Sequence, residues 1–152
     1  MWPRFVITLL GLLLVGCDPF YGVESRTSFH RPVDIECVNA ALASVPEAAP
    51  VTYQRRENRS TEILPKQRKV LTIVHSWLYG EGDGDILEIV HEPDGWDFTN
   101  ARRRMGVPVP HDEMVRFLPL MQKVNQAIGR QCELPVADLR ATAVGDTKSS
   151  DI

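Results

Sequence analysis

The hydrophobic positions of this chain recur with two different periods, and each period predicts a different kind of element. Between residues 33 and 46, apolar residues fall three or four positions apart, which predicts a helix with one apolar stripe: Ile35, Val38, Leu42 and Val45. Asp34 is placed to cap the start of this helix, and Pro46 to end it. A second stripe of this kind over residues 111–132 predicts a C-terminal helix. Pro119 inside it predicts a kink or a break into two helices.

Between these helices the pattern changes to the two-residue period of strands. Residues 69–80 are rich in β-branched and aromatic residues. One predicted strand face carries Leu71, Ile73, His75, Trp77 and Tyr79, and the other carries Val70, Thr72, Val74, Ser76 and Leu78. Two further strands are expected over 86–92 and from Trp96 onward, since Pro93–Gly95 is a strong hairpin signal. Residues 51–54 are a candidate fourth strand, and residues 55–68 are expected to form a polar loop. The chain therefore predicts an α+β domain, an antiparallel meander of three to four strands packed on the two helices.

The segments around this domain have a different composition. Residues 1–16 contain Arg4 followed by an apolar run from Phe5 to Gly16. This run has 12 residues, whereas a spanning helix needs roughly 20, so it fits the apolar core of a cleaved secretory signal. Residues 17–32 are polar and interrupted by glycine and proline, which predicts a flexible tether. The folded domain is expected over 33–135, with a frayed tail over 136–152.

The end of the apolar run carries the one family resemblance in the sequence. Leu14-Val15-Gly16-Cys17 resembles the lipobox of bacterial lipoproteins. The resemblance implies that the signal is cut before Cys17, that Cys17 is acylated, and that the protein is held by lipid at a membrane and faces the periplasm. An aspartate after the cysteine, here Asp18, resembles an inner-membrane retention signal, which favours the inner over the outer membrane.

Two cysteines remain once Cys17 is assigned to the lipid. Cys37 and Cys132 form an even pair in an oxidising compartment, and we therefore expect a disulfide between them. Such a bridge would join the start of the first helix to the end of the last, so that the two helices run antiparallel. The alternative is a catalytic or metal-binding thiol pair, which no CxxC motif or cysteine–histidine cluster supports.

Charge adds one local feature to an acidic chain. The formal net charge is -3, so the protein lacks the basic character of nucleic-acid-binding proteins. Arg102, Arg103 and Arg104 form a local basic run, which is either a solvated strand end or a contact for anionic headgroups or an acidic partner. The strand face bearing Val70, Val74 and Leu78 is a second candidate contact, because the helices are expected to cover the other face.

The sequence contains residues suited to metal binding, but each set of candidate ligands is incomplete. Glu81, Asp83 and Asp85 alternate as in calcium loops, yet Ile86 stands where an EF-hand needs glycine. His75 and His91 on neighbouring strands would make half of a zinc site.

No catalytic motif and no cofactor-binding fingerprint is found, and we expect neither cofactor nor metal. The sequence favours a lipid-anchored, non-catalytic accessory or interaction subunit at a membrane surface. A small-ligand or metal-binding lipoprotein, and an envelope hydrolase or an inhibitor of one, remain alternatives.

Overall fold

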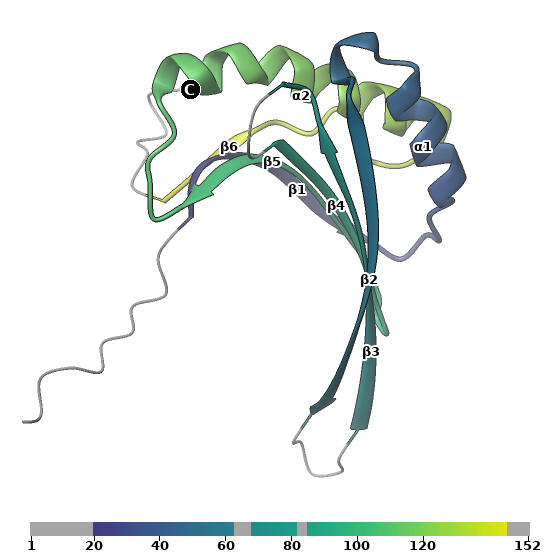
Figure 1. Cartoon of the computed structure of the whole chain (residues 1–152). Helices are drawn as coiled ribbons and strands as arrows, with labels where there is room; N and C mark the ends of the chain where they lie inside the picture. Colours follow the sequence, from purple (N-terminus) through teal and green to yellow (C-terminus); the bar gives the residue numbers. More distant parts are fainter. Residues whose placement is uncertain (1–19, 63–67, 82–84, 146–152) are drawn as a thin grey trace, which may run out of the picture.

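A computed structural model of the chain describes residues 20–62, 68–81 and 85–145. Two helices, α1 (Ile35–Ala43) and α2 (His111–Gln131), cover one face of an antiparallel sheet (Figure 1). The sheet has six strands in the order β2-β3-β4-β5-β1-β6. Their bounds are β1 (Phe20–Phe29), β2 (Val51–Glu62), β3 (Arg68–Tyr79), β4 (Asp85–Glu92), β5 (Gly95–Met105) and β6 (Thr142–Val144). The α+β class and the meander β3-β4-β5 are confirmed, but the predicted number of strands was too small.

The expected tether over residues 17–32 is wrong where the structure describes it. β1 pairs with β5 along its whole length, from Phe20 opposite Met105 to Phe29 opposite Trp96. The strand is hard to recognise from the sequence because Ser25 and Thr27 interrupt the apolar residues Val23 and Phe29 on its inward side. Val23 is its one fully buried aliphatic residue. Tertiary pairing, rather than β-propensity, makes this segment a strand.

At Gly22 the main chain of β5 leaves no space for a side chain. A Cβ at Gly22 would lie 2.0 Å from the main-chain oxygen of Arg102, and its φ of 143° is one that other residues rarely adopt. Glycine at this position therefore lets β1 approach β5.

The expected tail over 136–152 is also wrong for its first part. Val136 is fully buried, and Thr142–Val144 pairs with β1 as β6. Residues 146–152 lie outside the described part of the chain.

The polar loop expected over 55–68 is a strand up to Glu62. Every side chain from Val51 to Ser60 is exposed, so the strand shows no apolar alternation. β2 pairs with β3 from Val51 opposite Tyr79 to Glu62 opposite Arg68. β4 pairs with β3 from Ile73 to Leu78, so residues 58–62 and 68–72 form a two-stranded ribbon that extends beyond the rest of the sheet (Figure 1).

The core lies between the sheet and the helices. From the sheet, Trp77, Tyr79, Leu87, Ile89 and Phe98 are buried beneath apolar residues of α1 and α2. The helices thus cover the predicted strand face of β3, on which His75 is also buried. Leu71 shares that face but is 44% exposed, because it belongs to the ribbon.

The helix ends follow the sequence signals closely. Asp34 caps α1, its carboxylate accepting from the main-chain N–H of Glu36 at 3.0 Å and of Cys37 at 3.3 Å. A single-turn helix, η1 (Pro46–Ala48), follows α1. α2 continues through Pro119 as one helix, so the alternative of two separate helices is wrong. Pro119 lies on the exposed side of α2, where water can bond the carbonyl that the proline leaves without a donor.

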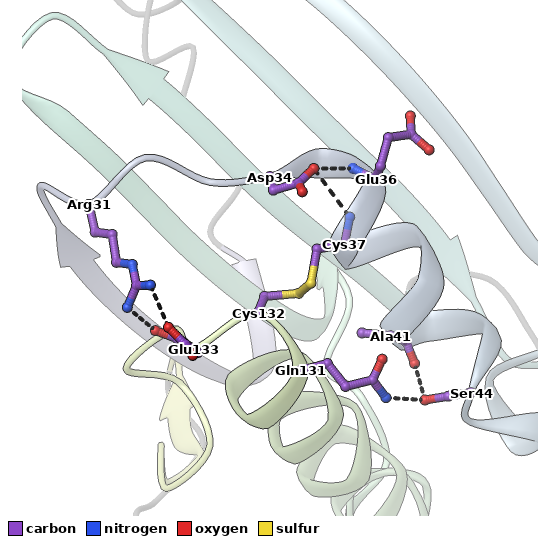
Figure 2. The surroundings of a disulfide bond; sticks show 9 residues. All are labelled: Arg31, Asp34, Glu36, Cys37, Ala41, Ser44, Gln131, Cys132 and Glu133. Atoms are coloured by element: carbon purple, nitrogen blue, oxygen red, sulfur yellow. Dashed lines mark hydrogen bonds and ion pairs between the residues drawn. A yellow bond between two sulfur atoms is a disulfide. The ribbon is translucent and has the colours of Figure 1, made fainter.

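The predicted disulfide joins the two helices (Figure 2). Cys37 in the first turn of α1 bonds Cys132, the residue that follows α2, across a Cα–Cα distance of 5.8 Å. Ser44 after α1 accepts from the side chain of Gln131 at 2.8 Å, and Glu47 bonds Lys123. As the residue number rises from Cys37 to Glu47, the number of its partner falls from Cys132 to Lys123, so the two segments run antiparallel.

Candidate functional site

A cleft of about 730 Å³ opens where the end of β5 meets the first turns of α2. Its charged lining residues come from five segments of the chain: Glu47, Glu81, Asp85, Arg102, Arg104, Glu113 and Arg116. Several of these charges are already paired. Glu47 bonds Lys123 at 2.5 Å, and this hydrogen bond lowers the pKa of the Glu47 carboxyl. Arg116 bonds Asp112 one turn earlier in α2.

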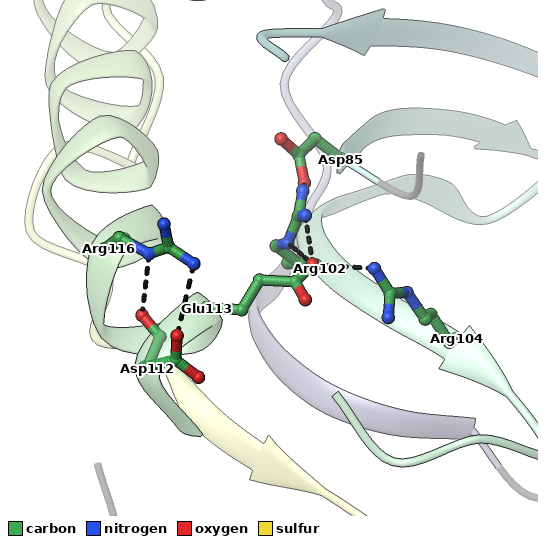
Figure 3. Close-up of polar contacts among 6 residues, drawn as sticks. All are labelled: Asp85, Arg102, Arg104, Asp112, Glu113 and Arg116. Carbon is green, nitrogen blue, oxygen red and sulfur yellow. Dashed lines mark hydrogen bonds and ion pairs between the residues drawn. The ribbon is translucent and has the colours of Figure 1, made fainter. Parts of the chain in front are cut away.

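Arg102 lies at the centre of a cluster of ion pairs that lines this cleft (Figure 3). Its guanidinium bonds Asp85 on β4 and, through Nε at 2.8 Å, the carboxylate of Glu113 on α2. Arg104 donates to the same oxygen of Glu113 at 2.8 Å, and the Arg102 guanidinium lies 5.7 Å from the centre of the Phe117 ring. The side chains of Arg102 and Asp85 are 10% and 4% exposed. The cluster therefore fastens the start of α2 to the sheet.

Glycoside hydrolases use two carboxylates in one cleft. The positions of Asp85 and Glu113 can be compared with that arrangement. In such enzymes the substrate lies between the two acids, and one of them must give up a proton. Here the guanidinium of Arg102 occupies the space between Asp85 and Glu113 and bonds both. The geometry is that of a buried ion-pair cluster rather than of a general acid and base.

The structure does not gather the three predicted arginines into one patch. Neighbouring residues of a strand point to opposite faces. Arg102 and Arg104 therefore lie on the face that carries α2 and bond Glu113. Arg103 lies on the outer face, where it bonds Glu24 at 3.2 Å and Glu88 at 3.6 Å. None of the three is an unpaired charge.

Val70, Val74 and Leu78 do share the outer face of the sheet, as predicted. Leu78 is exposed, Val74 is half-buried and Val70 is buried. The register places Val74 opposite Val90, and Leu78 opposite Ile86. The ion pair between Arg56 and Glu88 crosses the same face, so its apolar residues are interrupted by charge.

The histidines of the sheet take part in aromatic contacts. Tyr53 stacks on His75, and its hydroxyl lies 2.8 Å from His75 Nδ1. Burial, together with Arg55 and then His91, lowers the pKa of His75, so its ring is neutral at neutral pH. His91 stacks on Trp96 with the ring centres 4.1 Å apart.

Among the described residues, the candidate metal ligands considered from the sequence do not form a cluster. His75 and His91 are each paired with an isoleucine of the neighbouring strand rather than with one another. Among residues 20–62, 68–81 and 85–145, no three histidine, cysteine or acidic residues lie close enough to hold an ion. Asp83 of the suggested calcium loop lies outside the described residues.

A buried polar chain connecting four elements was missed at the sequence level. The Tyr79 hydroxyl donates to Asn100 at 2.6 Å, Asn100 donates to Asn125 at 2.8 Å, and Asn125 donates to Ser25 at 2.9 Å. Burial raises the pKa of the Tyr79 phenol, which therefore stays protonated as the donor. One signal was available, because Asn125 stands on the apolar stripe of α2, one turn after Met121.

The strand β2 forms one edge of the described sheet, and its side chains from Val51 to Ser60 are exposed. No described strand pairs with the free side of β2, and β2 has no proline between Val51 and Glu62. In an antiparallel strand about half of the main-chain groups point to each side, so a row of donors and acceptors faces solvent. This strand contains three arginines, Arg55, Arg56 and Arg59, and two acids, Glu57 and Glu62. The edge therefore joins free hydrogen-bonding groups to a net positive charge.

Comparison with protein-family models, curated proteins and solved structures finds no match for this chain. Of the helices in the described part of the chain, none combines the length and the apolar character that crossing a bilayer requires. Cys17 and Asp18 precede the described residues.

Proposed function

We propose that this chain is a lipid-anchored protein of the bacterial envelope that acts as a non-catalytic interaction subunit on the periplasmic side of a membrane. Acylation of Cys17 would supply the anchor, and Asp18 favours the inner membrane. The domain would present the open edge of β2 and the ribbon to an envelope protein. An extended segment of that partner would pair with β2 as an added strand.

The ribbon is the observation that carries the interaction role. Its residues 68–72 have β2 as their strand partner and extend past β4, and Leu71 remains 44% exposed. A two-stranded ribbon is marginally stable without further contacts. Natural sheets usually shorten or cover an edge of this length. A long, open edge supports a role in binding.

The charge of the edge favours an acidic partner segment. Arg59 is 83% exposed, and its nearest acid, Glu57, is shared with Arg55 at 2.7 Å. Lys69 on the opposite strand of the ribbon is exposed as well. An acidic strand laid along β2 would meet these cations, while main-chain hydrogen bonds would supply affinity that does not depend on its sequence.

The test is site-specific photo-crosslinking of the full chain in intact cells. A photoreactive residue at Asn58 or Arg59 should give one discrete adduct with the same envelope protein. The matched control is Arg130, an exposed arginine on the last turn of α2, which should give no such adduct. Arg59→Glu should weaken the adduct formed from Asn58 by several-fold, and Arg130→Glu should leave it unchanged. Equal adducts from both surfaces, or none from the ribbon, would contradict the proposed role.

A further inference from the structure

A second exposed apolar surface lies at the opposite end of the strand register. Phe20 at the start of β1 is paired with Met105 at the end of β5, and they are 43% and 63% exposed. Val107 follows two residues later and is 57% exposed. Phe20, Met105 and Val107 form what we call the anchor-end patch. Apolar side chains exposed together on a surface are typical of sites that contact another molecule or a membrane.

The length of chain before this patch limits where it can lie. Cys17 precedes Phe20 by three residues, and an extended chain spans at most about 3.6 Å per residue. Phe20 therefore lies within about 11 Å of Cys17. This placement rests on the proposed acylation of Cys17, which would put that residue at the lipid interface. A polar headgroup layer is about 5–8 Å thick on each side of a bilayer, so Phe20 can lie no more than a few ångströms beyond this layer.

The strand pairing fixes Phe20 relative to the rest of the domain. β1 is hydrogen-bonded into the sheet from Phe20 onward, with β5 on one side and β6 beside Gly22–Glu24. Only residues 18 and 19 stand between Cys17 and the first residue of β1. Any acyl anchor on Cys17 would therefore turn the same end of the sheet toward the bilayer.

The charges around the patch indicate how it would bind lipid. The Arg103 guanidinium lies 4.7 Å from the centre of the Phe20 ring but already bonds Glu24 and Glu88. Arg104 bonds Glu113. Because these cations have acidic partners, the contact should depend on apolar insertion and little on anionic headgroups.

We propose that the anchor-end patch inserts into the lipid interface beside the acylated Cys17 and holds the domain with its β1–β5 end toward the membrane. The acyl chains retain the protein, and the patch fixes its orientation. The ribbon is then carried away from the anchor, on the far side of the sheet from β1.

Depth-dependent fluorescence quenching on the full-length lipidated protein tests this inference. Val107→Cys adds one reactive thiol, since Cys37 and Cys132 are bonded and Cys17 is acylated. The protein is labelled with a polarity-sensitive dye and reconstituted into phosphatidylcholine vesicles that carry a nitroxide on the upper acyl chain. We expect quenching at Val107→Cys to be at least threefold stronger than at Arg59→Cys on the ribbon. The same ratio is expected in vesicles containing phosphatidylglycerol.

A second variant checks that the patch itself makes the contact. Met105→Ser should reduce the quenching at Val107→Cys severalfold, whereas Leu71→Ser, which removes an exposed apolar residue from the ribbon, should not. Flotation of the vesicles reports the anchor separately. Protein that floats without quenching at Val107→Cys overturns the inserted patch but leaves the lipid anchor standing. Quenching that requires phosphatidylglycerol overturns the apolar mode of binding. Protein that does not float overturns both the anchor and the patch.

Discussion

At the scale of single residues, the buried amide of Asn125 has the clearest energetic role. It joins Ser25 on β1 to Asn100 on β5, and both partners are fully buried. A buried polar group is tolerated when its hydrogen bonds are made, and it becomes costly when a partner is removed. α2 is therefore positioned over the sheet by polar contacts as well as by apolar packing.

Removing that amide should cost stability that an exposed amide does not provide. Asn125→Ala leaves Ser25 and Asn100 without their partner, and we expect a loss of about 1–3 kcal/mol in the free energy of unfolding. Urea denaturation of the purified protein measures this loss. Asn58→Ala on the exposed ribbon is the matched control and should change the free energy by less than about 0.5 kcal/mol. An equal effect of the two variants would show that the buried chain does not stabilise the fold.

At the scale of elements, the disulfide makes α1 and α2 one unit on the sheet. It closes a loop of 95 residues that contains strands β2 to β5. A cross-link over so long a loop removes many conformations from the unfolded chain, so its effect on stability should be large.

The double variant Cys37→Ala, Cys132→Ala is expected to lose about 2–5 kcal/mol in the free energy of unfolding. The measurement is urea denaturation of wild type and variant, each with and without a reducing agent. Reduction should lower the midpoint of the wild type to that of the variant and leave the variant unchanged. A wild-type midpoint that does not respond to reduction would mean that the bond contributes nothing.

The elements that sequence reasoning found and missed differ in what they bury. α1, α2, β3 and β4 place apolar side chains at regular spacing over the core, and their period is visible in the sequence. β1 and β2 lack this signal. β1 turns Ser25 inward to meet Asn125, and β2 has no covered face. Both strands are set by pairing with neighbours, which a one-dimensional pattern does not encode.

The candidate sites divide in a similar way. Cysteine counting was sufficient for the disulfide, because pairing two thiols needs no knowledge of the fold. The arginine run does not form one patch, because a two-residue period sends Arg103 to the opposite face from Arg102. The acids that bind Arg102 come from β4 and α2, and nothing local to either segment indicates that they meet.

At the scale of the whole molecule, acylation of Cys17 is expected not to depend on the disulfide of the domain. Acyl chains contribute about 0.8 kcal/mol per buried methylene, and Cys17 is the residue that would carry them. Cys17→Ala should abolish incorporation of radiolabelled palmitate into the protein. The variant lacking Cys37 and Cys132 is the control and should keep the label. Labelling that persists in Cys17→Ala would contradict the lipid anchor.

The position of β1 in the sheet also has a consequence for how the protein is made. β1 is the first described strand, yet Ser28 finds its partner Asp97 69 residues later, and Cys37 finds Cys132 95 residues later. A chain exported with its amino terminus first would present β1 to the envelope long before β5 and α2 arrive. Contacts so distant in sequence slow folding, because a long loop must close before they form. During biogenesis, β1 could therefore pair with a strand of another protein before β5 and α2 have emerged. Acylation of Cys17 would confine this competition to the membrane surface.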